Sequence, residues 1–498
     1  MNHLEVKNNQ CIPVLSIPVL GYEQFLEHNT SLLKESHYHC VNYYGFRFQG
    51  KIKLICCIAN DKEGTIYISS SIVEQHQTLS SFTHHHLAFH IFEREIHENF
   101  GINYTDHTWL KPTRFSFNRA DKNSTVANYP FYKIESEELH EVGVGPIHAG
   151  VIEPGHFRFI CNGEQILHLE IQLGFQHRGI ENLFLEKKKL LQRITLAENI
   201  SGDAVSGHTT CFVNLWESLC NYKADEELQY ARTVALELER IAIHTGDLSA
   251  MCTDVAYQLG SSVFGRLRTP VINYFQIWCG NRLAKGLIRA GKNHFPLHKT
   301  LCDTLHKLFD DYEPDFDEMC KETFTLPTVL ARFEKTGIVT TEQASSIGTV
   351  GMSARMSGIN RDIRSSHPHN FYSSLNHQPI IKNHGDVYSR AQIRKEEIKQ
   401  SIGYIRKLSE NIPSENKNRT ILSPPSSDSF VISLVEGWRG EICHCAITDE
   451  KGELVHYKVK DPSMHNWLAL ALAVRNNEIS DFPICNKSFD LSYCGHDL

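Results

Sequence analysis

Short runs of apolar residues dominate the first 115 positions and predict strands. The runs KLICCIA at residues 53–59 and GTIYISSSIV at residues 64–73 have the composition of buried strands. Between residues 85 and 100, HHLAFHIFEREIHENF instead places apolar residues at helical spacing. Short strands combined with a helix predict a small α/β domain over residues 1–115.

The pattern changes after this region. Residues 116–140 are polar and without a clear period, which predicts a linker. From there to about residue 405 the pattern is helical, with apolar residues three and four positions apart at residues 181–200, 224–251 and 390–410. These segments predict a large, mainly helical domain over residues 141–498.

The last hundred residues predict a loop and further strands. Residues 411–429 are rich in Pro, Ser and Asn and predict a surface loop. Two strand-like runs follow, FVISLVEGWRGEICHCAIT at residues 430–448 and ELVHYKVKD at residues 453–461, and then a helix and a closing segment. The predicted class is α+β, with β-strands at the periphery of the helical domain.

Composition excludes several classes of protein. With 498 residues, 41% hydrophobic and 22% charged, the chain is typical of a globular protein of two or three domains. A net charge of -8 gives no basic surface for nucleic acid. No apolar run is long enough to span a bilayer, and the first residues do not resemble a secretory signal. We therefore expect a cytoplasmic protein, peripheral on the inner face of the cell membrane through partners.

The short clusters of cysteine and histidine in the sequence are better explained by structural roles than by metal binding. None of the 15 cysteines forms a Cys-x-x-Cys pair. Cys56–Cys57 and Cys443–His444–Cys445 lie in strand-like runs, and residues 84–86, three histidines before a helix, are expected on the solvated surface. The glycines of GVGPIHAG, residues 143–150, have the wrong spacing for a dinucleotide fold, so we expect neither NAD nor a nucleoside triphosphate to bind.

Six stretches combine charged residues with glycine and apolar residues, and because buried charges need partners they predict a common polar network. They are EREIHENFGINYTDH (93–107), GPIHAGVIEPGHFRF (145–159), GFQHRGIEN (174–182), HTGDLSA (244–250), GMSARMSGINRDIR (351–364) and VEGWRGEI (435–442).

These motifs carry a resemblance that covers nearly the whole chain. The first resembles the signature of the 30-kDa-type subunit of respiratory complex I. The others resemble the 49-kDa-type quinone-site subunit of complex I and the large subunits of group 4 nickel–iron hydrogenases. The fused order is similar to that of the hydrogenase-4 component G and formate hydrogenlyase large subunits.

The resemblance also locates the positions of four nickel-ligand cysteines. In AENISGDAVSGH, Glu198 and His208 match the family, whereas Ser201 and Ala204 stand at the two cysteine positions. In the closing segment Ser492 and Gly495 stand at the other two, and Cys494 is one residue out of register. Soft thiolates suit nickel, and these replacements do not provide them. We expect no nickel–iron site and no hydrogenase activity.

The quinone site of the family is only partly retained. His148 matches the first histidine of the hairpin loop, Ile152 replaces the quinone-contacting one, and the tyrosine position falls near Gly202. Asp247 is retained. Glu153 matches the glutamate that passes protons in the hydrogenase branch.

Two roles are open for Glu153. It either transfers protons or forms an ion pair with Arg178, Arg355 or Arg439 in a structural network. His148, Glu153 and Asp247 are therefore the candidate cavity and proton-transfer residues.

The remaining motif residues are expected to be structural. The resemblance implies ion pairs at the interface with a small iron–sulfur subunit, and it puts the arginine-rich motif beside the same cavity. Asp490 is expected to be the polar anchor of the closing segment. The residues of this interface or structural network are His177, Arg178, Glu181, Glu239, Arg240, Arg355, Asp362, Arg439 and Asp490, with Arg361 beside them.

The leading hypothesis is a subunit of a membrane-associated, respiratory-type oxidoreductase complex that resembles hydrogenase-4 and NADH–quinone oxidoreductase. Its cavity would couple electron transfer to proton or cation movement. The chain itself would bind no cofactor: a tetranuclear iron–sulfur cluster would belong to the partner subunit, with a quinone as one implied acceptor. The other partners would be membrane subunits of an antiporter-like arm.

Two other hypotheses remain. One is a non-catalytic scaffold that docks the membrane module or a partner enzyme. The other, an active hydrogenase, requires bound nickel.

Overall fold

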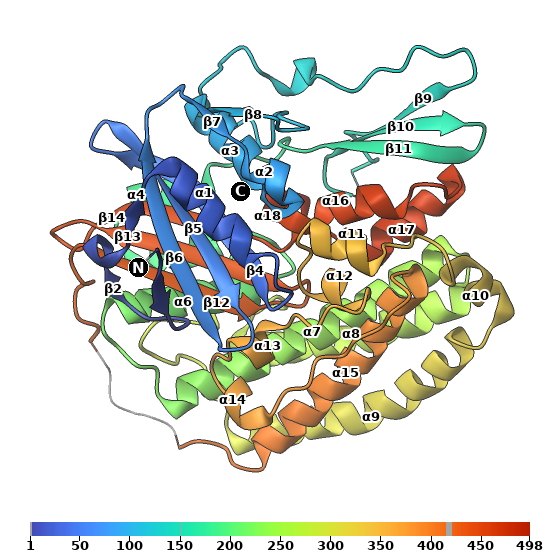
Figure 1. The fold of residues 1–498 in the computed structure, drawn as a ribbon. Coiled ribbons are helices and arrows are strands. Elements are labelled where there is room, and N and C mark those ends of the chain that lie inside the picture. Colours follow the sequence, from blue (N-terminus) through green and yellow to red (C-terminus); the bar gives the residue numbers. More distant parts are fainter. Residues whose placement is uncertain (1, 151, 415–420) are drawn as a thin grey trace.

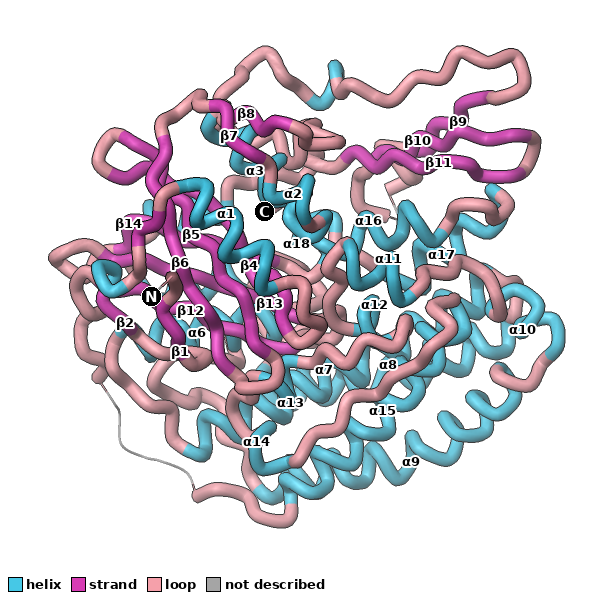
Figure 2. Tube along the Cα trace, in the orientation of Figure 1, coloured by secondary structure: helices cyan, strands magenta, loops and turns pink. Residues whose placement is uncertain are grey.

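The computed structural model describes residues 2–150, 152–414 and 421–498 (Figure 1). Long helices gather at the bottom of this view, and strands lie above them at the left and at the right. Figure 2 shows the same division by secondary structure. The predicted α+β class is confirmed.

The N-terminal residues build the first sheet, in the order β1-β6-β5-β4, with β3 parallel to β6. Both predicted strands are present, as β5 (Lys51–Asn60) and β6 (Thr65–Val73). The others are β1 (Leu4–Val6), β3 (Val19–Leu20) and β4 (Tyr38–Phe48). Buried residues of one sheet face form a core with α1 (Tyr22–Leu32), α2 (Phe82–His85) and α3 (His90–Phe100). Beside them β7 (Thr78–Ser80) pairs with β8 (Asn103–Thr105).

The second sheet joins the two ends of the chain. Its order is β14-β13-β12-β2, where β2 (Ile12–Pro13) comes from the N-terminal segment. The predicted C-terminal strands are present as β12 (Ser429–Glu436), β13 (Glu441–Thr448) and β14 (Leu454–Lys460). Buried residues of both sheets, such as Val41 and Ile432, belong to one core. The predicted N-terminal domain therefore shares its core with the C-terminal strands.

The predicted helical pattern is wrong for residues 140–172. The sequence pattern predicts a helical segment here, but the chain forms an antiparallel sheet of β9 (His140–Val144), β10 (His156–Asn162) and β11 (Gln165–Gln172). In β10 the buried Phe157 and Phe159 alternate with the half-buried His156 and Arg158, and Ile160 and Cys161 after them are both buried. A period of two is typical of a strand, and a helical period would not place Phe157 and Phe159 on one face.

The helical part is built around α7 (Glu226–Asp254), which lies against α8 (Gln258–Cys279) and α15 (Val387–Ser409). On the outside, α9 (Lys299–Thr323) packs on α8. A further helix, α6 (Val205–Leu219), covers β12 and β13 and so connects the bundle to the second sheet. The predicted helical segment at 181–200 is split into α4 (Ile180–Glu186) and α5 (Leu190–Ala197).

Short helices complete the chain. Between α9 and α15 lie α10 (Pro327–Phe333), α11 (Thr341–Ser346), α12 (Met352–Arg355), α13 (Ile363–Ser366) and α14 (Tyr372–Leu375). The closing segment forms α16 (Ser463–Ala473), α17 (Phe482–Phe489) and α18 (Tyr493–Asp497). Four 3-10 turns stand at Val14–Ser16, Leu87–Phe89, Val126–Asn128 and Ile479–Asp481. The last of them leads directly into α17.

Several smaller predictions can be compared with the structure. Cys443 and Cys445 lie on one face of β13, with their sulfur atoms 3.8 Å apart, and Cys56 and Cys57 lie in β5. Residues 84 and 85 are exposed, whereas His86 is half-buried and its Nδ1 accepts a hydrogen bond from the backbone of Ala88. In the predicted loop 411–429, residues 415–420 lie outside the described part. Among the described residues, none of the helices combines the length and apolar character that a bilayer crossing requires.

Candidate functional site

The four positions that the resemblance assigns to metal ligands come from two distant segments that the fold brings into contact. Ser201 and Ala204 precede α6, whereas Ser492 and Gly495 lie at the start of α18. The hydroxyl oxygens of Ser201 and Ser492 are 3.0 Å apart, and both residues are buried. We call Ser201, Ala204, Ser492 and Gly495 the clasp.

An ion pair lies directly beside the clasp. Arg439 donates to both carboxylate oxygens of Asp203, at 2.7 and 2.6 Å, while Ser201 donates to Asp203 at 2.7 Å. The guanidinium of Arg439 also stacks on Trp438, 3.9 Å from the ring centroid. A bidentate pair of this kind is rigid, because two parallel hydrogen bonds fix its orientation.

The clasp does not fit a nickel–iron centre. Such a centre needs four thiolates, whereas Ala204 and Gly495 carry no donor atom and serine hydroxyls ionise far less readily than thiols. A Cβ atom at Gly495 would lie 2.6 Å from the Asp461 carboxylate and 2.9 Å from the Ser492 hydroxyl. Burial raises the pKa of Cys494 to about 11, which keeps this out-of-register thiol protonated. Among the described residues, no group of three or more His, Cys, Asp or Glu side chains is arranged so that it could hold a metal ion.

A row of buried hydrogen-bonding groups begins beside the clasp. Asp461 contacts His208 Nε2 at 2.9 Å, His208 Nδ1 lies 3.1 Å from His444 Nε2, and His444 Nδ1 lies 2.8 Å from the Tyr457 hydroxyl. All four residues are buried. His444 stands between two cysteines of β13, so its side chain points to the opposite face, toward α6. In the sequence, His208 was identified only because it matches the family. The alternation of a strand at residues 443–445 already predicted that His444 points away from the two cysteines.

Glu239 caps the helix that follows the clasp. Its two carboxylate oxygens accept from the backbone amides of Ser206, at 2.6 Å, and Gly207, at 3.2 Å. Burial raises the pKa of Glu239 to about 8, and these hydrogen bonds offset only part of that effect. At neutral pH this carboxyl group therefore retains its proton.

Asp247 also lies in the interior, on α7. Its Oδ2 accepts from Arg394 Nε at 2.8 Å. Burial, and then the neighbouring carboxylate of Asp490, raise the pKa of Asp247 to about 8. Lys487 and Arg439 outweigh the effect of burial on Asp490 and lower its pKa to about 2. Of these two coupled acids, Asp247 is the one that holds a proton at neutral pH.

A dense cluster of charged residues lies between α7, which carries Asp247, and the second sheet. Its three arginines and four acids are all almost completely buried. They are Arg240, Arg355 and Arg364 with Glu237, Asp362, Glu397 and Glu436, and we call them the hub.

Glu397 and Glu436 have opposite electrostatic environments within the hub. Although burial opposes ionisation, Arg355 and the other arginines keep the pKa of Glu397 well below its ordinary value. Burial and the nearby Asp362 instead raise the pKa of Glu436 to about 7. Three guanidinium charges are thus balanced by three carboxylates, and Glu436 is the fourth acid, which titrates near neutrality.

A histidine of α7 also contacts the hub. His244 Nε2 lies 2.8 Å from Glu397, one helical turn before Asp247. Burial lowers the pKa of His244 to about 4, so this imidazole is neutral at physiological pH. Only Nε2 of this neutral ring contacts an acid, because His244 Nδ1 is buried without a hydrogen-bond partner.

The hairpin loop between β9 and β10 carries the other two candidates. His148 Nε2 donates to the backbone carbonyl of Gly155 at 2.8 Å, and Glu153 accepts from the backbone amide of Tyr493 at 3.3 Å. Glu153 thus contacts the closing segment next to the clasp. The expected arginine partners of Glu153 have other partners: Arg178 binds backbone carbonyls, Arg355 belongs to the hub and Arg439 pairs with Asp203.

The residues expected at an interface mostly hold this chain together. Arg240, Arg355 and Asp362 lie in the hub, and Glu239 caps α6. Each of these residues therefore pairs with an element of its own chain, in an internal network.

Three further residues hold the closing segment and β14. His177 donates to the carbonyl of Asp497 at 2.8 Å, and Arg178 donates to the carbonyl of Cys494 at 2.9 Å. Glu181 accepts from Lys458 at 3.0 Å. Arg361, near the hub, donates to the carbonyl of Thr349 at 3.0 Å.

Comparison with known proteins identifies a family that this chain resembles. The family described as "Respiratory-chain NADH dehydrogenase, 49 Kd subunit" matches residues 260–430, which include Asp362 and Glu397 of the hub. The chain is 28% identical over 352 residues to the carbon monoxide-induced hydrogenase of Rhodospirillum rubrum, covering 70% of this chain and 97% of that protein.

Two other relatives come from both branches. An NADH-quinone oxidoreductase subunit from Dehalococcoides mccartyi strain CBDB1 is 29% identical over 364 residues, 70% of this chain and 96% of that protein. Hydrogenase-4 component G of Escherichia coli K12 is 25% identical over 379 residues, 75% of this chain. The match spans 64% of component G.

Proposed function

Because the chain belongs to the superfamily of complex I 49-kDa subunits and group 4 hydrogenase large subunits, we propose that it is a subunit of a respiratory-type oxidoreductase complex. In this proposal it has no nickel–iron site. It lines a cavity beside a small iron–sulfur subunit and couples electron transfer to proton or cation movement. Membrane subunits of an antiporter-like arm attach the complex to the membrane.

The observation that carries the proposal is the set of buried acids that retain protons near neutral pH. Glu239 and Asp247 have pKa values of about 8, and Glu436 of about 7. Glu239 caps the helix that starts at the clasp, Asp247 contacts Asp490 of the closing segment, and Glu436 belongs to the hub. Buried acids with pKa values near the working pH are typical of sites that transfer protons.

Electrostatics links these acids to electron transfer. An added negative charge in the neighbouring subunit raises the pKa of a nearby buried carboxyl group, because the ionised form becomes less favourable. A group that titrates near pH 7 then takes up a proton, and it releases the proton when that charge leaves. Asp247, held at 2.8 Å by Arg394, is the residue that we expect to respond most directly.

The path would continue from Asp247 through the hub. His244 lies one turn away on α7 and contacts Glu397, which shares Arg355 with Glu436. A proton delivered to Glu436 has then moved from the bundle to the second sheet.

The decisive experiment is purification of the intact complex with its partner subunits, as wild type and as the Asp247→Asn variant. We expect iron–sulfur signals in the electron paramagnetic resonance spectrum, no nickel by elemental analysis and reduction of a quinone coupled to proton uptake. The variant should assemble normally and lose the coupled proton uptake. Stoichiometric nickel in the wild-type complex would contradict the proposal.

A second candidate function is a scaffold for the same complex. The packing of the clasp favours it, since Ser201 contacts Ser492 and Gly495 packs tightly against Asp461. A scaffold predicts that the Asp247→Asn complex keeps both its redox activity and its proton uptake. Equal coupling ratios in the wild-type and variant complexes would therefore replace the coupling proposal with the scaffold.

A further inference from the structure

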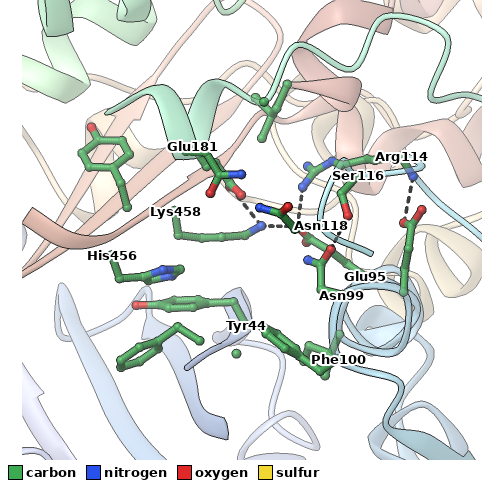
Figure 3. Close-up of a pocket in the computed structure, with 18 of the residues that line it drawn as sticks. Tyr44, Glu95, Asn99, Phe100, Arg114, Ser116, Asn118, Glu181, His456 and Lys458 are labelled. Carbon is green, nitrogen blue, oxygen red and sulfur yellow. Dashed lines mark hydrogen bonds and ion pairs between the residues drawn. The ribbon is translucent and has the colours of Figure 1, made fainter. Parts of the chain in front are cut away.

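A cavity interrupts the contact between the first sheet and the second sheet (Figure 3). It has a volume of about 560 Å³, and its lining includes residues 44–47 of β4 and residues 455–458 of β14. Lys458 is held there by Glu95 of α3 and Glu181 of α4. Side chains that line a void lose packing contacts, so the junction of the two sheets relies on its ion pairs.

A second group of charged residues joins the two sheets near the start of β4. His39 Nδ1 lies 3.0 Å from Asp61, which directly follows β5, and His39 Nε2 lies 2.7 Å from Glu441, the first residue of β13. His39 is 3% and Glu441 0% exposed. One imidazole ring thus reaches from the first sheet to the second. We call His39, Asp61 and Glu441 the latch.

Both contacts of His39 require a proton on the ring. An ionised carboxylate can only accept hydrogen bonds, so Nδ1 and Nε2 must each donate one. A ring that donates from both nitrogens is the imidazolium cation. The electrostatics agree with this geometry: although burial opposes it, the charges of Asp61 and Glu441 raise the pKa of His39.

The two acids of the latch stay ionised. Although burial opposes it, His39 and Arg361 lower the pKa of Asp61 to about 2. Against the same effect of burial, Lys460 and His39 hold the pKa of Glu441 below its ordinary value. Lys460 forms an ion pair with Glu441, and Arg361 Nε lies 3.7 Å from Asp61. Within the latch, His39 is therefore the member whose charge changes as the pH rises above neutrality.

Two further histidines lie near the latch. His367, which follows α13, has its Nδ1 3.7 Å from Asp61, and His465 belongs to α16. Burial lowers the pKa of both, so both rings are neutral at physiological pH. The titratable and charged groups around His39 are thus Asp61, Glu441, Lys460, Arg361, His367 and His465.

Loss of the proton from His39 breaks the latch. A neutral imidazole has one N–H group, so it can donate to Asp61 or to Glu441 but not to both. The other carboxylate then faces a ring nitrogen without a proton, in a buried place where an unpaired charge is costly. The side chain of Asp61 is 13% exposed, which gives the ring a route for proton exchange with solvent.

The latch also holds a turn that serves the clasp and the hub. Residues 437–440 connect β12 to β13 and lie between Glu436 of the hub and Glu441 of the latch. They include Arg439, which pairs with Asp203 beside the clasp. Opening of the latch would therefore release the first sheet from the turn that positions Arg439.

We propose that the latch is a pH-sensitive fastening between the first sheet and the second, closed while His39 is charged and opened as the pH rises. In the opened state β4 separates locally from β13. The stabilising effect of the latch is complete below about pH 6.5, the ordinary value for histidine, and it is lost as the pH rises through the raised pKa of His39. This inference goes beyond the proposed redox function and does not depend on it.

Hydrogen–deuterium exchange of the purified full chain tests the proposal. Mass spectrometry follows peptides from β4, from β13 and, as a reference, from α9 between pH 6 and 9, with correction for the intrinsic exchange rate at each pH. We expect the protection of β4 and β13 to fall by about tenfold or more, the effect of losing one hydrogen bond between charged groups. Protection in α9 should stay constant. Constant protection in β4 and β13, or an equal loss in α9, overturns the proposal.

Three variants identify the titrating group. His39→Gln cannot titrate, so its protection should not change over this range of pH. Asp61→Asn keeps an oxygen that accepts from His39 Nδ1 but removes the charge, so protection should be lost at a lower pH than in the wild type. His140→Gln removes an exposed histidine of β9 and should follow the wild-type profile.

The melting temperature of each variant at pH 6 is measured first, so that a folding defect is not mistaken for an open latch. If His39→Gln unfolds, Asp61→Asn still decides, because its side chain is partly exposed and the hydrogen bond to the ring remains possible. A wild-type pH profile in a folded His39→Gln or Asp61→Asn variant would show that another group titrates and would overturn the assignment.

Discussion

At the scale of single residues, the packing around position 495 leaves no room for a side chain. At Gly495 an added methyl group would lie 2.6 Å from Asp461, a contact that a folded protein does not tolerate without movement. Asp461 in turn holds His208, so the missing side chain is matched by a buried carboxylate that occupies the space. The absence of a side chain at Gly495 and the packing of Asp461 are parts of the same arrangement.

Gly495→Ala should lower the free energy of unfolding by about 1–3 kcal/mol, the usual cost of forcing an extra group into a packed core. Gly202→Ala is the matched control on the other side of the clasp, because nothing lies within 4 Å of its added Cβ atom. Urea unfolding of both variants measures the difference. Equal free energies of unfolding for the two variants would mean that the segment around Asp461 moves to accommodate the added methyl group without loss of stability.

The raised pKa of Glu239 makes stability depend on pH. An acid whose pKa is raised from 4.5 to about 8 on folding stays protonated in the folded state while the unfolded chain ionises. Glu239 therefore lowers the free energy of unfolding progressively as the pH rises from about 4.5 to 8. The stabilising effect of the acids with lowered pKa values is already complete at about pH 5, so these acids do not obscure this window.

Glu239→Gln cannot ionise and should lose this part of the pH dependence. Between pH 5 and 8 the wild type should lose more free energy of unfolding than the variant does, by an amount on the order of 2–4 kcal/mol. Urea unfolding at pH 5, 6, 7 and 8 gives the two slopes. Parallel slopes would show that Glu239 is ionised in the folded chain at pH 7.

At the scale of elements, the hub joins parts that are far apart in sequence. Arg355 at the end of α12 contacts Glu397 of α15 at 2.8 Å and Glu436 of β12 at 2.9 Å. Removing one member of a buried ion-pair cluster leaves the others unpaired in a region of low dielectric.

Arg355→Met should therefore cost about 3–5 kcal/mol of stability. Arg266→Met breaks an ion pair with Asp315 between the exposed faces of α8 and α9 and should cost less than about 1 kcal/mol. Thermal and chemical unfolding compare the two variants. A small loss for Arg355→Met would mean that water reaches the hub.

The elements themselves were mostly predictable from local pattern. The strands at 53–59, 64–73, 430–448 and 453–461 follow from short apolar runs, and the helices α7 and α15 from apolar residues three and four positions apart. The sheet at 140–172 was missed because the alternation around Phe157 and Phe159 covers few residues, between a polar linker and a helical region.

The contacts of the candidate site were less predictable. The sequence motifs placed Ser201 opposite Ser492 and grouped Arg355 with Asp362. They did not identify Glu397 or Glu237, which lie in ordinary amphipathic helices. The partner of a buried charge is set by tertiary packing, and a local pattern carries no information about it.

At the scale of the whole molecule, two sheets share one core. Ile12 of β2 pairs with Phe430 of β12, and the buried faces of both sheets meet in the same cluster. The N-terminal 115 residues are therefore packed directly against the C-terminal strands.

A chain that lacks residues 1–115 should expose the apolar residues Phe430, Ile432 and Leu434 and aggregate. Size-exclusion chromatography and circular dichroism of the truncated and full-length chains measure this. Wild-type-like helicity in a monomeric truncated chain would show that the larger part folds independently.

The pairing of β2 with β12 also sets an order of events in the cell. The partner strand of residues 12–13 begins at residue 429, so a ribosome has translated most of the chain before this pairing can form. Until then one apolar face of the first sheet, including Val41 and Ile55, has no cover. Nascent chains with a persistently uncovered face are those that need chaperones. Synthesis of this protein should therefore depend on chaperone capacity more than its final stability suggests.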